Sequence, residues 1–417
     1  MGKTNKKEVR IMHIVEGGVV APKGFKSGGK FIGLKKKRKD LSIVLSEIPC
    51  SFAALFTTNK VKAAPVIWNQ EIYNNYSKIR ALVINSGNAN ACTGQKGYED
   101  TVLTAKTLAK SIGADQHEIL VASTGVIGVP LPIDKITNNI DGLVQELDDD
   151  VVSGINAAEG IMTTDTNIKM ISVKIEIEGK EIHIGGMAKG SGMIHPNMAT
   201  MLSFITTDIN IDESLLRDTL KEITKDTYNM ISVDGDTSTN DMVIALANGM
   251  AGNAQIISRD ENYKIFYDAF LYVNKYLAQE IVRDGEGASK FIEVNVNGAK
   301  SKEDAILIVK SVLTSNLVKT ALFGEDANWG RVLCAAGYSG ADFNPDKATL
   351  YFESNNESIL LLEQGLPVTF DEDKAFNILK NNDITIRIEL EEGEGSSTGW
   401  GCDLSYEYVK INGEYRT

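Results

Sequence analysis

A threonine that follows directly on a small residue is the strongest candidate for chemistry in this sequence. Residues 189–204 have the sequence Lys-Gly-Ser-Gly-Met-Ile-His-Pro-Asn-Met-Ala-Thr-Met-Leu-Ser-Phe. The glycines and proline predict a loop, and the apolar run at 201–205 predicts a buried strand, so Thr200 stands at a loop-to-strand junction. The small side chain of Ala199 leaves its carbonyl open to the Thr200 hydroxyl, and a β-branched side chain has few rotamers.

Cleavage between Ala199 and Thr200 would make Thr200 both a nucleophile and a base. Attack by the hydroxyl on the Ala199 carbonyl gives an ester, and hydrolysis of that ester frees the α-amine of Thr200. An α-amine has an ordinary pKa of about 7.7–8.0, which suits a base at neutral pH. Threonine also begins many strands because of its shape alone, and residue types taken by themselves favour that simpler interpretation. The case for catalysis depends on the rest of the chain.

Two other glycine-containing stretches could serve such a nucleophile. Ser-Thr-Gly-Val-Ile-Gly at 123–128 follows a predicted strand, and a sharp turn there could present the backbone N–H groups that stabilise an oxyanion. Arg-Asp-Gly-Glu-Gly at 283–287 follows a predicted helix and holds the Glu286 carboxylate between two glycines. Residue types taken by themselves favour the simpler interpretations, a plain glycine turn and an incidental glutamate at a helix C-cap.

Two polar stretches are less suggestive than they look. Ser-Val-Asp-Gly-Asp-Thr-Ser-Thr-Asn-Asp at 232–241 has the composition of a calcium loop but lacks the glutamate that ends an EF-hand loop, so we expect a polar turn and no metal. Lys-Lys-Lys-Arg-Lys at 35–39 could bind nucleic acid, but no aromatic residues are interleaved with it. We expect a solvated loop there.

The composition is that of an ordinary globular protein that acts on small solutes. Of 417 residues, 43% are hydrophobic and 24% are charged, which predicts two or three structural units. The 43 basic and 56 acidic residues give a net charge of −13, which disfavours nucleic acids and anionic membranes as partners. No secretory segment and no run of 18 apolar residues occurs, so we expect a cytoplasmic protein. The cysteines form no C-x-x-C pair, which indicates reduced thiols and no metal site; they are Cys50, Cys92, Cys334 and Cys402.

Strand and helix patterns alternate along the chain and must position these candidates. Strands are predicted at 41–45, 52–57, 79–84, 119–122, 170–177, 181–187, 201–205, 242–246 and 290–296. Helices are predicted at 98–112, 133–147, 151–162, 212–230 and 263–282. From about residue 300 the elements are shorter, with helical patterns at 303–313, 330–337 and 375–380 and strand patterns at 384–390 and 400–411. This change predicts a second, smaller α/β unit.

Several long blocks, in a fixed order, resemble the ornithine acetyltransferase family. They are Gly24-Phe25, Asn-Ser-Gly-Asn-Ala-Asn at 85–90, the stretches at 123–128, 189–202 and 283–287, and Trp-Gly-Cys-Asp-Leu at 400–404 with Asn412 and Tyr-Arg-Thr at 415–417. The resemblance covers essentially the whole chain. It implies an α+β fold in which residues 1–288 form an αββα sandwich and residues 289–417 form a smaller C-terminal α/β domain.

The resemblance also implies self-cleavage and a reaction. Cleavage between Ala199 and Thr200 would give an α chain of 1–199 and a β chain of 200–417, which in this family assemble as α2β2. The implied enzyme of arginine biosynthesis transfers acetyl from N2-acetyl-L-ornithine to L-glutamate without a cofactor, and some members also accept acetyl-CoA as donor. Thr200 matches the nucleophile, and Thr124 and Gly125 match the pair that stabilises the oxyanion. The positions that match substrate contacts are Thr163, Lys189, Thr200, Glu286, Asn412 and Thr417.

Amide acyl transfer by such a site would proceed through an acetyl-Thr200 intermediate with ping-pong kinetics. The assignment of Thr163 is the least secure, because Thr164 is adjacent and the match could shift by one residue. Two other classes of protein stay open. One is a self-cleaving aminopeptidase or amidohydrolase with an N-terminal threonine, and the other is a non-catalytic amino-acid-binding protein.

Overall fold

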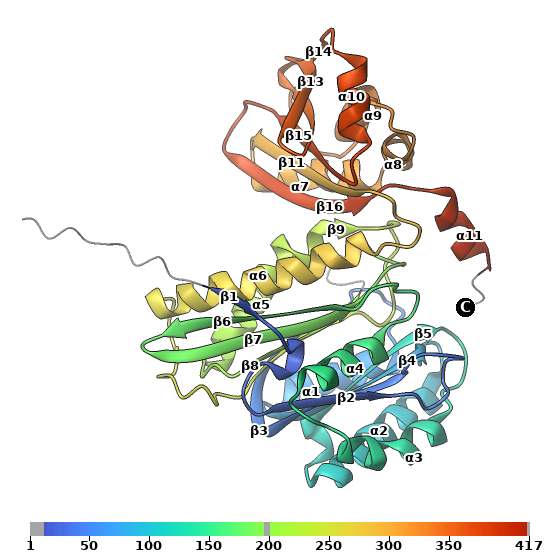
Figure 1. Cartoon of the computed structure of the whole chain (residues 1–417), viewed down its shortest axis with the longest axis vertical. Coiled ribbons are helices and arrows are strands. Elements are labelled where there is room, and N and C mark those ends of the chain that lie inside the picture. Colours follow the sequence, from blue (N-terminus) through green and yellow to red (C-terminus); the bar gives the residue numbers. More distant parts are fainter. Residues whose placement is uncertain (1–11, 196–200, 415–417) are drawn as a thin grey trace, which may run out of the picture.

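A computed structural model describes residues 12–195 and 201–414, which form a larger and a smaller unit (Figure 1). The larger unit is built around β3 (Leu41–Phe56), a strand long enough to belong to two sheets. Its second half pairs with β10 (Met242–Ala247), whereas its first half pairs with β2 (Phe25–Lys30) and β4 (Ile79–Asn88). The two strands predicted at 41–45 and 52–57 are therefore one continuous strand.

The strands on either side of β3 form two stacked sheets. The first sheet runs β1 (His13–Val15), β6 (Lys169–Ile177), β7 (Lys180–Lys189), β8 (Leu202–Thr207), β10 and β3, and the second contains β2, β3, β4 and β5 (Ile119–Val126). The strand β8 carries apolar side chains on both of its faces, and each face is buried. Leu202 and Phe204 pack into the core between the sheets, and Ile205 packs into the core beneath the outer helices.

Helices cover both outer faces and produce the αββα sandwich that the resemblance predicted (Figure 1). On the first sheet lie α5 (Glu213–Asp226) and α6 (Glu261–Arg283), and on the second lie α1 (Ala64–Asn75), α2 (Gly94–Ile112) and α3 (Ile133–Gln145). The helix α4 (Val151–Ile161) contacts both β2 and β7 and lies between the sheets. The 3-10 turns are η1 (Gly18–Val20), η2 (Gln116–Glu118), η3 (Tyr228–Met230) and η4 (Pro345–Lys347).

The smaller unit is a seven-stranded sheet packed against helices, as expected for an α/β unit. Its strand order is β14 (Leu366–Pro367), β13 (Glu357–Glu363), β12 (Thr349–Ser354), β15 (Asp383–Glu389), β11 (Phe291–Ala299), β16 (Gly395–Cys402) and β9 (Ile231–Ser232). Its helices are α7 (Lys302–Thr314), α8 (Asn316–Phe323), α9 (Trp329–Gly337) and α10 (Glu372–Leu379). The edge strand β9 comes from the larger unit, so the two units share a sheet. The division of the chain at 288/289 stays a prediction.

The prediction of a strand at 400–411 is wrong in its second half. The strand β16 ends at Cys402, and α11 (Tyr406–Glu414) carries the chain back toward the larger unit. Asp403 accepts hydrogen bonds from the backbone N–H groups of Ser289 (2.8 Å) and Lys290 (3.0 Å), which fixes the chain where the strand stops. The start of the smaller unit is thereby tied to its end.

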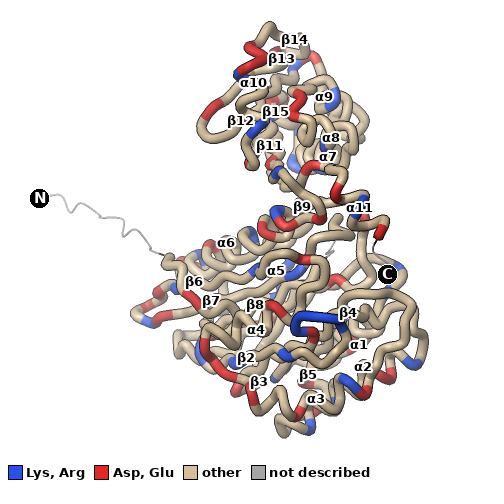
Figure 2. The backbone as a smooth tube through the Cα atoms, turned by 45° about the vertical axis from the view of Figure 1, so that its right-hand side comes forward, with Lys and Arg blue, Asp and Glu red and all other residues tan. Residues whose placement is uncertain are grey.

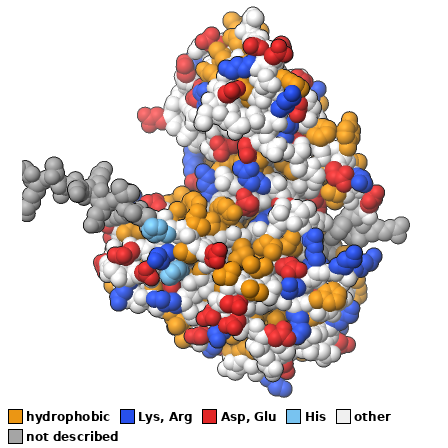
Figure 3. Space-filling view, in the orientation of Figure 1, with side chains coloured by type: hydrophobic (Ala, Val, Ile, Leu, Met, Phe, Trp, Pro, Cys, Tyr) orange, Lys and Arg blue, Asp and Glu red, His pale blue; other side chains and the backbone are white. Residues whose placement is uncertain are grey.

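Charges of both signs are interspersed on the face seen in Figure 3, and the basic run at 35–39 forms a continuous stretch beside β4 (Figure 2). Within residues 12–195 and 201–414, no single helix has the length and apolar content to cross a membrane; α7 and α8 meet those two criteria only as a bent pair.

Candidate active site

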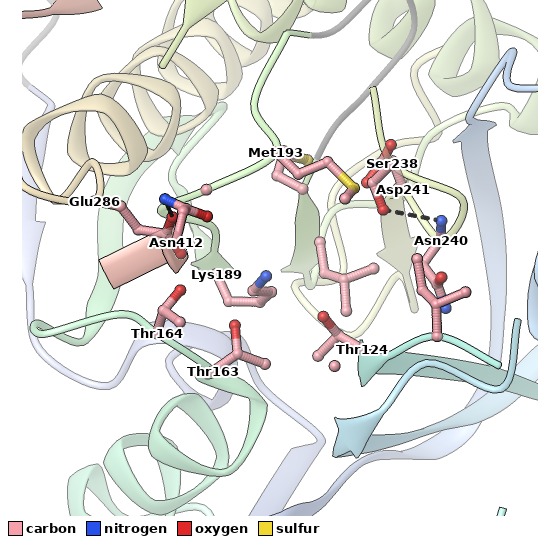
Figure 4. A pocket seen from close by; sticks show the side chains of 15 residues that line it. Thr124, Thr163, Thr164, Lys189, Met193, Ser238, Asn240, Asp241, Glu286 and Asn412 are labelled. Carbon is pink, nitrogen blue, oxygen red and sulfur yellow. Dashed lines mark hydrogen bonds between the residues drawn. The ribbon is translucent and has the colours of Figure 1, made fainter. Parts of the chain in front are cut away.

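A cavity of about 130 Å³, with many polar side chains in its wall, opens at the end of the space between the two sheets. It collects side chains from β5, from the loop after α4, from the ends of β7 and β8, and from the loops before β10 and after α6, with α11 closing one side (Figure 4). The residues that line it are Thr124, Gly125, Ile127, Thr163, Thr164, Lys189, Gly192, Met193, Met201, Leu202, Ser238, Asn240, Asp241, Glu286 and Asn412.

This cavity brings together six of the predicted site residues: Thr124, Gly125, Thr163, Lys189, Glu286 and Asn412. Ala199, Thr200 and Thr417 lie outside the described residues. Met201, to which Thr200 is covalently joined, lines the cavity. The cavity is therefore one residue along the chain from the predicted nucleophile.

Lys189 places a buried positive charge in the middle of the cavity. It is the last residue of β7 and pairs with Leu202 of β8, so its side chain enters the space between the sheets. Its side chain is 8% exposed, and among the described residues no carboxylate lies within ion-pair distance of its ammonium. A buried ammonium without such a partner can bind the carboxylate of a ligand. Figure 4 places Lys189 between Glu286 and Asn412 on one side and Thr124 and Asp241 on the other.

Thr124 and Gly125 lie near the end of the strand β5, where it is still paired with β4, and not in a turn after the strand. The strand continues to Val126, which corrects the expectation of a sharp turn at 123–128. Gly125 has φ of 129°, and a Cβ there would lie 2.4 Å from the carbonyl carbon of Gly87. Only glycine fits this position, because the backbones of β4 and β5 approach closely at a register shift.

Asn240, which sequence reasoning did not select, fixes this strand end. Its side-chain amide donates to the carbonyl oxygens of Ala89 (2.6 Å) and Ser123 (2.8 Å). The Ser123 hydroxyl in turn donates to Asn85 (2.6 Å). The amide-rich block at 85–90 and Asn240 therefore hold the backbone next to Thr124. The only available signal was the concentration of polar residues at 232–241, which fitted a plain turn as well.

Glu286 is held against the opposite wall. Its backbone N–H donates to the carbonyl of Ser191 (2.8 Å), and its carboxylate accepts from the side chain of Asn412 on α11 (2.8 Å). A Cβ on Gly192 would lie 2.3 Å from Glu286 Oε2, so the glycine makes room for the carboxylate. The packing of α11 against this turn brings together two residues that are 126 positions apart.

Thr163 and Thr164 both line the cavity, so the structure leaves the choice between them open. The backbone N–H of Thr163 donates to Asp165 (2.8 Å), whereas the hydroxyl of Thr164 lies 2.6 Å from that of Ser191. Hydrogen bonds to Asp165 and Ser191 therefore hold the two threonines in place.

A buried ion triad that the sequence did not reveal joins three loops around the cavity. Lys169 contacts Asp165 at 2.7 Å and Asp284 at 2.5 Å, and all three side chains are at most 5% exposed. Asp165 also accepts from the N–H of Gly190 (2.7 Å), and Asp284 accepts from the N–H of Thr166 (3.0 Å). Burial by itself would raise the pKa of Asp165, but Lys169 and then Lys189 outweigh it and hold that pKa well below its usual value.

The stretch at 232–241 organises the loop before the predicted cleavage site. Asp234 accepts from the backbone N–H groups of Met193 (2.6 Å) and Ile194 (2.8 Å). Thr237 donates to the carbonyl of His195 (2.9 Å). Across the described parts of the chain, no three His, Cys, Asp or Glu side chains come close enough to hold a metal ion. The Asp234 carboxylate, part of the composition that suggested a calcium loop, instead accepts hydrogen bonds from these backbone amides.

The basic run at 35–39 is only partly the solvated loop that was expected. Lys36 and Lys37 are exposed, but the Lys35 ammonium donates to the carbonyl of Met162 (2.8 Å) and Arg38 donates to that of Asp165 (2.7 Å). Burial lowers the pKa of Lys35 to about 8. The basic run therefore holds the loop that carries Thr163 by hydrogen bonds. The sequence had predicted no part in the site for this run.

The αββα sandwich and its cavity define an enzyme that handles small polar substrates. The buried Lys189 ammonium, the end of β5 with Gly125, and the carboxyl groups of Asp241 and Glu286 line the cavity.

The ArgJ family model matches residues 26–417. The arginine biosynthesis bifunctional protein ArgJ of Caldanaerobacter subterraneus subsp. tengcongensis is 52% identical over 406 residues, which cover 97% of this chain and 100% of that protein. The protein of the same name from Thermotoga neapolitana is 54% identical, over 95% of this chain and 99% of that one.

A solved structure agrees with these relatives. The crystal structure of arginine biosynthesis bifunctional protein ArgJ from Bacillus halodurans has 45% identity and a TM-score of 0.50 and covers 52% of this chain and 100% of that chain. The chain described here belongs to the ArgJ family. The resemblance drawn from the sequence is confirmed.

Proposed function

We propose that this protein transfers the acetyl group of N2-acetyl-L-ornithine to L-glutamate, through an acetyl ester on Thr200, as a step of arginine biosynthesis. The observation that carries the proposal is the position of Lys189. Its ammonium has no carboxylate partner among the described residues and stands between the Thr124 backbone and Glu286. Both substrates have an α-carboxylate, and a buried ammonium is the group that binds one.

The two ends of the cavity suit the two ends of acetylornithine. With its α-carboxylate at Lys189, the acetamide faces Thr124 and Gly125, and the distal ammonium extends toward Glu286. The Glu286 carboxylate, oriented by Asn412, offers a partner of opposite charge. The C-terminal carboxylate of Thr417 is a second partner that we propose for this ammonium. Glutamate then occupies the same place with its own α-carboxylate at Lys189.

The chemistry is nucleophilic acyl transfer in two half-reactions. The Thr200 hydroxyl attacks the acetyl carbonyl while the freed α-amine of Thr200 takes its proton. Negative charge develops on the carbonyl oxygen, and the Thr124 hydroxyl with the Gly125 N–H donates to it. One such donor stabilises the transition state by about 3 kcal/mol. Ornithine leaves with the proton, and glutamate attacks the ester in the second half-reaction.

Cleavage between Ala199 and Thr200 is part of the proposal, and a length comparison supports it. The predicted fragment 200–417 has 218 residues, about 52% of the 417 in the chain. The solved chain from Bacillus halodurans is matched along its full length by 52% of this chain, as one fragment would be. The fragments should stay associated, because β7 of the first pairs with β8 of the second. We propose an α2β2 assembly on family grounds.

We propose that this route needs no cofactor and that acetyl-CoA serves as a second acetyl donor. We also propose a cytoplasmic location for the protein. The word "bifunctional" in the names of the relatives fits two donors.

The test combines a denaturing gel with an assay of the purified protein. We expect two bands, exchange of acetyl from acetylornithine to glutamate, and parallel lines in initial-velocity plots. Replacing Thr200→Ala should leave one full-length band and no transfer. Lines that intersect would contradict an acetyl-enzyme, and loss of acetylornithine without glutamate would indicate a hydrolase. A second assay with acetyl-CoA in place of acetylornithine decides whether that donor is used.

A further inference from the structure

The cavity contains a second carboxyl group that has no role in the mechanism above. Asp241 is 3% exposed, and within residues 12–195 and 201–414 its Oδ2 atom has no hydrogen-bond partner. An unsatisfied buried carboxyl oxygen is costly, and natural proteins keep such atoms at places where a ligand or a reacting group completes them. Asp241 lines the cavity beside Ser238 and Asn240 (Figure 4).

Asp241 directly precedes the strand β10, which pairs with the residues that follow the predicted nucleophile in the sequence. The next residue, Met242, pairs with Leu202, and its N–H donates to the carbonyl of Met201 (3.0 Å). The first residue of β10, next to Asp241, is thus hydrogen-bonded to the residue that follows Thr200 in the sequence. On the far side of β8, Leu202 pairs with Lys189, so the cation and the carboxyl flank the start of β8.

We propose that Asp241 is a catalytic residue that stores the proton of the substrate amine between the two half-reactions. This inference rests on the proposed acyl transfer and adds the residue that exchanges a proton with the substrate amine. The α-nitrogen of acetylornithine enters as part of a neutral amide and leaves as the ammonium of ornithine. The α-nitrogen of glutamate arrives as an ammonium and must lose a proton before it can attack. One proton therefore has to be given and then recovered in every cycle.

Asp241 can balance this cycle without solvent. In the first half-reaction the Thr200 hydroxyl proton passes through the Thr200 α-amine to the leaving nitrogen, so the C–N bond breaks and neutral ornithine amine forms. The Asp241 carboxyl then gives its proton to that amine, and ornithine departs as an ammonium. Glutamate enters, returns one proton to the Asp241 carboxylate and attacks the ester. Its second proton passes through the Thr200 α-amine to the Thr200 oxygen as the C–O bond breaks.

The environment of Asp241 suits a carboxyl that holds a proton at rest. Burial raises the pKa of Asp241 well above its ordinary value, against the opposing effects of Lys189 and of hydrogen bonds from Ser238. Among the described residues, the charged group that faces it is the Lys189 ammonium of β7. The group therefore has a proton to give when ornithine leaves.

The experiment measures transfer to glutamate as a function of pH in wild type and Asp241→Asn. Without the carboxyl, glutamate must bind as the small fraction that solution already holds as free amine, and this fraction rises about tenfold per pH unit below the pKa of the amine. We expect kcat/KM for glutamate to fall about 100-fold at pH 7. It should also rise about tenfold per unit from pH 6 to 7.5, where wild type changes little. Asp236→Asn is the matched control, because Asp236 is an exposed aspartate of the same loop, and it should behave as wild type.

Each outcome separates this inference from the proposed function. If wild type does not transfer acetyl, the proposed function fails. If wild type transfers acetyl but Asp241→Asn keeps a profile parallel to wild type, or only raises KM equally at every pH, Asp241 is not the proton store. Should Asp241→Asn fail to cleave itself, Asp241→Glu keeps a carboxyl: a slower enzyme with a flat profile supports the inference, and a steep profile overturns it.

Discussion

Lys169 and Asp284, 115 positions apart, form a buried ion pair of 2.5 Å that joins the two fragments predicted from cleavage at residue 199/200. Asp284 is two residues from Glu286, and the second partner of Lys169, Asp165, holds the backbone of Gly190 next to Lys189. One cation therefore links the three loops that carry the proposed substrate contacts, and it does so without touching the cavity.

Replacing Lys169→Met should destabilise the fold strongly. The change leaves two buried carboxylates without their cation, and breaking a buried pair in this way costs about 3–5 kcal/mol. Thermal unfolding of the variant should show a clearly lowered midpoint. The matched control is Lys174→Met, because Lys174 is a half-exposed lysine five positions further along the same strand whose ion pair with Glu181 lies at the surface. A Lys169 variant as stable as the Lys174 variant would contradict the role of the triad.

Asn240→Ala should lower kcat more than it raises KM. The change removes donors from two buried carbonyl oxygens, each loss costing about 1–3 kcal/mol, and frees the backbone beside Thr124 and Gly125. Asn253→Ala is the control, since its amide also donates to two carbonyls, at 3.1 Å and 2.7 Å, outside the cavity. We expect similar losses of stability from the two variants and a loss of about tenfold or more in kcat for Asn240→Ala alone. Equal activities would show that Asn240 is only structural.

Sequence reasoning found the elements whose own residues dictate them. The apolar residues at 201–205 predicted the buried strand β8, whereas the glycine at 125 suggested a sharp turn and in the structure allows a close approach of two backbones. It missed β2, whose sequence Phe-Lys-Ser-Gly-Gly-Lys has no strand alternation. The glycines there are required by packing, because a Cβ on Gly29 would lie 1.9 Å from the carbonyl oxygen of Asn156 in α4.

The residues missed at the site have functions that depend on contacts between distant segments. Lys169 begins an apolar strand, and nothing near it in sequence indicates that Asp284 will face it. The strand predicted at 400–411 failed for a related reason. Tyr406 and Tyr408 continue an apparent alternation, but α11 buries none of its described residues and is positioned instead by Ser405, which donates to Gly287 (2.6 Å), and by Asn412.

Gly192→Ala should reduce activity while the protein stays folded. The added methyl would lie 2.3–2.5 Å from the carboxyl atoms of Glu286, so the carboxylate must move away from its bond with Asn412. We expect KM for acetylornithine to rise about tenfold, equivalent to about 1.4 kcal/mol of lost binding. Gly413→Ala is the control, because a Cβ there meets nothing within 4 Å. A Gly192 variant with unchanged KM would show that Glu286 does not contact this substrate.

The stability of the uncut chain should fall with rising pH because of Asp241. Burial raises the pKa of this carboxyl in the folded state, so the folded protein keeps a proton that the unfolded chain loses near pH 4. The stability that this proton contributes is fully present below that pH and is lost as pH rises through the folded pKa, by about 1.4 kcal/mol per unit. Urea unfolding of Thr200→Ala, which we expect to stay one chain, measures it. Adding Asp241→Asn should flatten the slope above pH 4, and adding Asp236→Asn should not; equal slopes in all three proteins would mean that Asp241 is ionised in the folded state.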